Sequence, residues 1–241
     1  MIPFFKTHYS ISKSILTLEE SPEKDGADSI WEICKEYDIK DLYLVEDSMS
    51  GFLKAYEGAE KERLNLRFGL RMSCKNTEAS EDSNHKIVMF ALNSAGCGDL
   101  NKLSSEINIK LGGVANYEYL KTNWTKNLQM VVPYYDSFLF QNLFSFNRCM
   151  PDFSFCKPVF VKENNGLPFE IQYNRELATF EKDYEFLNAK SVYYKTREDF
   201  KAWQTFKCMH RKGFGKASLG KPEMPHCCSS EFCIESWKES L

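Results

Sequence analysis

Residues 41–72 constrain the fold of this chain more than any other segment, because two apolar runs flank a helical pattern there. Residues 42–45 form a short apolar run, which is typical of a strand covered on both faces. Residues 51–63 are rich in Ala, Glu and Lys and predict a helix, and residues 66–72 predict a second strand. A strand, a helix and a strand in this order predict one βα unit with two parallel strands.

The same alternation continues along the rest of the chain. We expect further helices at 30–37, 100–107, 138–144, 170–186 and 198–211, and further strands at 87–91, 128–132, 159–161 and 191–194. Six or seven such repeats, with no run of consecutive strands, predict an α/β fold with a mostly parallel sheet, either open or closed. No long linker rich in Pro, Gly or Ser divides the chain, so we expect residues 1–241 to form a single domain.

Composition narrows the class of protein. Of the 241 residues, 43% are hydrophobic and 27% are charged, which is ordinary for a globular protein. No apolar run reaches the ~18 residues of a membrane helix, and the first residues lack a signal-peptide pattern. The nine cysteines are irregularly spaced and odd in number, which favours reduced thiols. We therefore expect a cytoplasmic protein with no membrane association.

The turn after the first predicted strand of residues 41–72 is the first place to look for chemistry. Ligands of α/β proteins collect outside the carboxyl ends of parallel strands. Glu46, Asp47 and Ser48 occupy that turn, and Arg71 lies near the end of the next strand. Asp47 alone is a clear candidate metal ligand, so the position suits a metal site whereas the residue types mostly do not.

Four segments, in order along nearly the whole chain, carry a family resemblance. They are His8-Tyr9-Ser10 with Ser14-Ile15-Leu16, residues 42–72, residues 85–103 (HKIVMFALNSAGCGDLNKL), and residues 163–212 with Asn165-Gly166-Leu167-Pro168. Together they resemble the polymerase-and-histidinol-phosphatase (PHP) domain, in the version at the N-terminus of bacterial C-family replicative DNA polymerases. The resemblance implies an irregular (βα)7 barrel of mostly parallel strands.

The chain departs from the family at the positions that the resemblance assigns to metal ligands. The opening His-x-His falls on Phe4 and Lys6, and the family's Gly-x-Glu falls on Gly69-x-Arg71. The family pocket would consist here of Phe4, Lys6, His8, Ser10, Asp47, Ser48, Arg71, His85, Asn165, Ser191 and Tyr193. A metal cluster needs several converging ligands and an open position for water. Asp47, with His85 as a second candidate, cannot supply them, so we expect no catalytic residues and no cofactor.

Two positive charges stand where the family holds metal ions. If Arg71 lies near Asp47, a salt bridge between them would fill the former metal site. The alternative to a protein without a cofactor is one that binds zinc or manganese. Zinc-ligand residue types also occur near the C-terminus, at Cys208, His210, His226, Cys227, Cys228 and Cys233. Adjacent cysteines point in different directions and cannot easily both bind one ion, so free thiols are the favoured interpretation of this cluster.

These departures favour a non-enzymatic subunit or scaffold in a DNA replication assembly, with a DNA polymerase or another replication protein as its partner. The chain has no room for the other polymerase domains, so it would act as a separate subunit. The alternative is a metal-dependent phosphoesterase or 3'–5' exonuclease with a rebuilt site drawn from Asp47, His85, Glu46 and His8.

A basic segment is the candidate contact surface. Residues 195–221 contain eight Lys or Arg against two acidic residues, although the whole chain has a net charge of −3. The candidates are Lys201, Lys207, Arg211, Lys212 and Lys216. They could meet the phosphates of nucleic acid or an acidic protein face, and a solvated face is the plainer interpretation.

Overall fold

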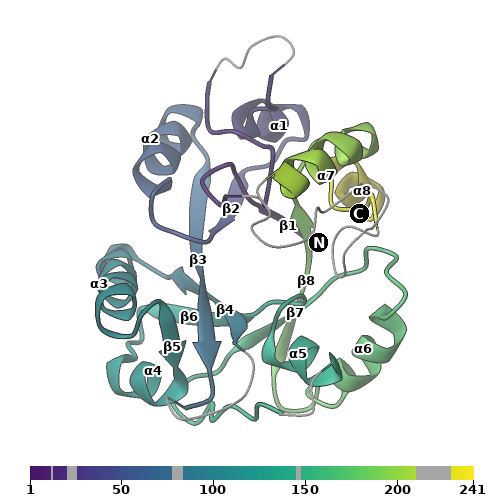
Figure 1. The fold of residues 1–241 in the computed structure, drawn as a ribbon. Coiled ribbons are helices and arrows are strands. Elements are labelled where there is room, and N and C mark those ends of the chain that lie inside the picture. The colour runs from purple at the N-terminus through teal and green to yellow at the C-terminus, as the bar shows by residue number, and fades with distance from the viewer. Residues whose placement is uncertain (12, 21–25, 78–83, 145–147, 210–228) are drawn as a thin grey trace.

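The computed structural model describes residues 1–241 except residues 12, 21–25, 78–83, 145–147 and 210–228. Helices surround a central set of strands (Figure 1). The strands are β1 (Ile2–Phe5), β2 (Asp41–Glu46), β3 (Asn65–Lys75), β4 (His85–Ala91), β5 (Val114–Asn116), β6 (Leu128–Val132), β7 (Val159–Lys162) and β8 (Glu185–Val192). The helices are α1 (Ile30–Glu36), α2 (Phe52–Glu62), α3 (Ser94–Lys110), α4 (Tyr117–Asn123), α5 (Phe138–Phe144), α6 (Glu170–Ala178), the 3-10 helix η1 (Arg197–Asp199), α7 (Phe200–Met209) and α8 (Ile234–Glu239).

The sheet closes on itself. The hydrogen-bonded order β2-β1-β8-β7-β6-β4-β3 is completed by pairing of β2 with β3, which gives a closed seven-stranded barrel. β5 lies outside this ring and pairs in parallel with the end of β3, where Ser73 faces Val114. The prediction of an α/β fold is thus confirmed, and the sheet is closed rather than open.

β4 runs against the direction of its neighbours. It pairs in antiparallel fashion with β3 and with β6, for example Cys74 with His85 and Val88 with Val131. The expectation that no two strands follow one another directly is wrong here, because β4 is the next element after β3 among the described residues. An antiparallel return needs only a short connection, whereas a parallel one needs a crossover.

The helix expected at 170–186 is too long. α6 ends at Ala178, and Glu185–Val192 form β8, which pairs with both β1 and β7. The four glutamates of residues 170–186 suit a helix locally, but β8 is needed to join β7 to β1. Tertiary pairing therefore overrides local propensity, and Glu185 and Phe186 are strand rather than helix.

α1 and α2 cover the outside of β1 and β2 with a tightly packed cluster. Trp31 of α1 is buried together with Phe5 and Leu44, and its Nε1 donates to Leu18 O at 2.9 Å. A Cβ at Gly58 of α2 would stand 2.3 Å from the Trp31 ring. Only glycine therefore lets α2 approach α1 so closely.

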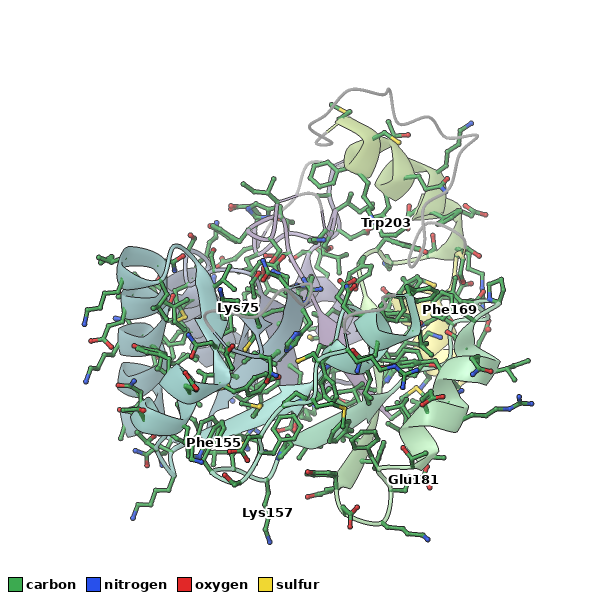
Figure 2. All side chains as sticks on the ribbon, turned by 60° about the horizontal axis from the view of Figure 1, so that its bottom comes forward. Lys75, Phe155, Lys157, Phe169, Glu181 and Trp203 are labelled. Atoms are coloured by element: carbon green, nitrogen blue, oxygen red, sulfur yellow. The ribbon has the colours of Figure 1, made fainter. Side chains whose placement is uncertain are left out.

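The two ends of the barrel are distinct. Figure 2 shows α7 with Trp203 at one end of the molecule, and Lys157 and Glu181, which precede β7 and β8, at the other. Trp203 Nε1 donates to Lys13 O at 2.9 Å. We call the end near Trp203, where the parallel strands finish at Lys6, Asp47 and Glu163, the barrel mouth.

Candidate functional site

An ion-pair chain crosses the barrel mouth. Lys6 Nζ and Arg71 Nη1 each lie 3.1 Å from Asp47 Oδ1, and Arg71 Nη2 also pairs with Asp136. The Lys6 and Arg71 residues are only 5% and 7% exposed. The predicted contact between Arg71 and Asp47 is present, because β2 and β3 are neighbours in a register that pairs Glu46 with Leu70.

The ion pairs with Lys6 and Arg71 fix the negative charge on Asp47. Burial alone would raise the pKa of that carboxyl, but the charges of Lys6 and Arg71 outweigh burial and hold the pKa well below its usual range. Burial lowers the pKa of Lys6 to about 8, with Asp47 opposing the shift and Arg71 adding to it. One oxygen of Asp47 thus receives two cationic donors, so its negative charge is already balanced by the protein itself.

Glu46 anchors the loop that follows β1. Its Oε1 accepts from Thr7 N at 2.8 Å and from Thr7 Oγ1 at 2.6 Å, and its Oε2 accepts from Ser10 Oγ. Ser10 Oγ in turn accepts from Asp47 N at 2.8 Å. Burial raises the pKa of Glu46, and Lys6 together with these hydrogen bonds opposes the rise. Ser10 therefore links the loop to β2, whereas His8 is exposed and its ring contacts Tyr9.

A second buried carboxyl lies on the β7 and β8 side of the mouth. Glu163 Oε2 accepts from Ser191 N at 2.9 Å and from Asn165 Nδ2 at 3.1 Å, and its Oε1 accepts from Ser191 Oγ at 2.8 Å. Asn165 Nδ2 also donates to Tyr135 Oη at 2.7 Å, and Tyr135 Oη donates to Glu170 Oε1 at 2.9 Å. Burial raises the pKa of Glu163 against the effect of its hydrogen bonds.

Sequence reasoning missed Glu163, Asp136, Tyr135 and Glu170. Glu163 follows the apolar run of β7 as Glu46 closes that of β2, and this position was the available signal. Asp136 follows β6 only after Pro133 and two tyrosines, in the left-handed backbone region with φ 60°. No pattern in the sequence separates it from an ordinary turn residue.

The two sides of the mouth enclose a cavity of about 40 Å³. Its lining includes Phe4, Lys6, Arg71, Tyr135, Glu163, Ser191 and Tyr193. Phe4 packs against the rings of Tyr43 and Phe90, and Tyr193 stacks on Phe232. A space of this size holds only a few water molecules at about 10–15 Å³ each. A substrate therefore does not fit within it.

His85 does not join the ion-pair chain. Its ring is buried at the start of β4, where Nε2 lies 2.9 Å from Tyr117 Oη and the two rings stack. Ser48 also lies at the mouth, half-buried, and its Oγ donates to Ser50 Oγ at 3.0 Å. The structure thus brings together Lys6, Asp47 and Arg71 on one side and Asn165 and Ser191 on the other, but places His8 and His85 elsewhere.

The basic segment is described only in part. Lys201 is exposed on α7, and Lys207 Nζ lies 4.7 Å from the ring centre of Trp203. The other candidates, Arg211, Lys212 and Lys216, lie outside the described residues, as do His210, His226, Cys227 and Cys228. Cys233 is buried at the start of α8, where its Sγ accepts from Ser236 N.

Metal-ligand clusters and membrane-spanning helices are both absent from the residues that the structure describes. In the part of the chain that the structure describes, no three His, Cys, Asp or Glu side chains come together in a way that could hold a metal ion. Over the same residues, no helix has the length and apolar character needed to cross a lipid bilayer.

Comparison with known proteins adds no relative. No protein-family model matches the chain, and no curated protein matches its sequence. The chemistry of the barrel mouth therefore has to carry the functional argument.

Proposed function

We propose that this chain is a PHP-like barrel of the irregular (βα)7 type that has exchanged its metal site for an internal ion-pair chain. In this proposal the chain is not an enzyme. It acts as a binding subunit or scaffold in a DNA replication assembly and works in the cytoplasm beside a separate polymerase or accessory protein.

The observation that carries the proposal is the pairing of one Asp47 oxygen with both Lys6 and Arg71. A hydrolytic metal centre needs anionic or neutral ligands that converge on one point and leave a coordination position for water. The cations Lys6 and Arg71 at Asp47 would repel a divalent metal ion. In a partly buried site, two like unit charges that lie 4 Å apart repel each other by ~4 kcal/mol. The residues that occupy the site thus oppose the binding of a metal cluster.

The choice of a replication partner rests on the family resemblance of the four sequence segments. The cavity of about 40 Å³ supports the non-enzymatic part of the proposal, because a phosphoester does not fit within this space between Lys6, Arg71 and Glu163.

Metal content is the first test. Protein purified without chelators or affinity-tag metal should contain less than one equivalent of transition metal by inductively coupled plasma mass spectrometry. It should also fail to hydrolyse a phosphodiester or a labelled 3' DNA end when manganese or zinc is added. Two or more equivalents of metal together with hydrolysis would overturn the proposal in favour of a phosphoesterase or exonuclease with a rebuilt site.

The partner is tested separately. Co-expression with a C-family polymerase from the same source and co-purification of the two chains would support the replication assignment. Failure of every replication protein of that source to co-purify would overturn the assignment, whatever the metal content.

A further inference from the structure

The outside of the barrel has a recess between α2 and α3, which are neighbouring helices in Figure 1. β4 is the next described element after β3, and the two strands are antiparallel. α2 contacts β3 and α3 contacts β4, but no described helix lies between them along the chain. The strip where β3 meets β4 therefore has no covering helix of its own among the described residues.

The recess has a volume of about 380 Å³, and most of its lining is apolar. Leu66 and Phe68 come from β3, Phe52 from α2 and Leu100 from α3. The rings of Phe52 and Phe68 pack edge to face with their centres 5.1 Å apart. A hollow of this size with apolar walls suits the apolar side chains of another molecule.

The adjoining face of α2 carries exposed apolar side chains. Leu53 is 64% exposed and Tyr56 is 46% exposed. Together with Glu60 they follow the spacing i, i+3 and i+7, so all three lie on one face of the helix. Tyr56 and Glu60 also line the recess, so this face borders it. One patch thus presents both protruding apolar side chains and an apolar hollow.

The charged residues that line the recess, Glu60 and Arg67, have opposite signs. Both are exposed, and Glu60 accepts a hydrogen bond from Tyr56 Oη at 2.9 Å. Within the described part of the chain neither forms an ion pair. In a two-fold interface the same patch meets itself, so an acid and a base in that patch can each pair with the opposite member on the other copy.

We propose that this patch joins two copies of the chain in a two-fold dimer, in which α2 of each copy covers the recess of the other. Leu53 and Tyr56 of one copy enter the recess of the second copy, and Glu60 of each copy pairs with Arg67 of the other. A second copy thus supplies the covering helix that the strip between β3 and β4 lacks. The inference concerns the outside of the barrel rather than its mouth, so it does not depend on the proposed function.

The dimer is expected to be weak. One helix face and one recess form a small surface, and small interfaces are typical of transient contacts. We expect a dissociation constant of about 100 µM. At the few micromolar used for urea denaturation the chain is then monomeric, so charge changes at Glu60 or Arg67 do not alter the measured stability through dissociation.

Sedimentation equilibrium of the intact chain tests the dimer, at concentrations from about 10 µM to about 1 mM. Glu60→Arg brings two basic groups together across the interface, and Arg67→Glu brings two acidic groups together. Each variant alone should therefore raise the dissociation constant at least about tenfold. An equimolar mixture of the two variants should dimerise as the wild type does, because each copy then carries the charges that the other lacks.

The matched controls are Glu118→Arg and Arg175→Glu, which reverse exposed charges outside the recess and should dimerise as wild type. Recovery in the mixture would also show that each recess variant is folded. A wild-type chain that stays monomeric at the highest concentration would overturn the inference and leave the recess to a different protein or a small apolar ligand. Dimers that persist in both recess variants, or a mixture that does not recover, would also overturn it.

Discussion

The two sides of the barrel mouth bury carboxyl groups in opposite ways. Asp47 on the β2 side is held by two cations, and its pKa lies well below the usual range. Glu163 on the β7 side is held by hydrogen bonds from Ser191 and Asn165, and burial raises its pKa. The comparison shows that the neighbouring cations, more than burial as such, decide which carboxyl keeps its charge.

Arg71→Glu should have the largest effect, because it places a third acid beside Asp47 and Asp136 and removes the cation that pairs them. Breaking a buried ion pair in this way costs about 3–5 kcal/mol in the free energy of unfolding. Urea denaturation measures the loss. Arg67→Glu, at an exposed position of the same strand, should change stability by less than about 0.5 kcal/mol.

Adding manganese to the Arg71→Glu variant gives a second test of this prediction. If the new glutamate restores a metal site, added manganese should recover part of the stability of Arg71→Glu and leave the wild-type chain unchanged. A neutral effect of Arg71→Glu without metal would contradict the view that the ion-pair chain holds the mouth together.

Glu163→Gln should change how stability depends on pH. The raised pKa of Glu163 means that its contribution to stability is fully present below the unfolded value of about 4.3 and declines as pH rises through the folded value. Glutamine keeps the shape, and its Nε2 can donate to Ser191 Oγ. The free energy of unfolding of Glu163→Gln should therefore fall less than that of the wild type as pH rises above about 4.3.

Urea midpoints over a pH series provide this measurement. Glu57→Gln, at an exposed position of α2, should keep the wild-type pH profile. Identical profiles for Glu163→Gln and wild type would show that the carboxyl on the β7 side titrates alike in the folded and unfolded chains.

Ser191→Ala should have the smallest effect. It removes one of the three hydrogen bonds that Glu163 accepts but leaves those from Ser191 N and Asn165. The loss should be about 1 kcal/mol in the free energy of unfolding, and it should grow as pH rises and more of Glu163 ionises. Ser48→Ala serves as the control, since the hydrogen bonds of the Ser48 side chain to described residues stay within its own loop, at Ser50. A loss that is independent of pH would contradict the hydrogen-bonded account of Glu163.

The sequence allowed the prediction of the β2, α2 and β3 unit and of the Asp47–Arg71 contact, since parallel neighbours finish at one end of a barrel. It did not reveal β1 or β5, which have four and three residues. The direction of β4 depends on its antiparallel pairing with β3 and β6, and β8 depends on ring closure. Glu163 and Asp136 become site residues only through contacts between distant segments, which no local pattern encodes.

Ring closure also has a consequence for how the chain reaches its folded state. β1, the first strand to be synthesised, pairs with β8 through contacts such as Ile2 with Ala189. During translation, β1 therefore has no β8 partner until roughly 190 further residues have been synthesised and have left the ribosome. Until then β1 and β7, the two strands that β8 joins, have open edges that can pair with other chains. Contacts between such distant segments form slowly. We expect chains truncated before β8 to aggregate, and the full chain to complete its fold late.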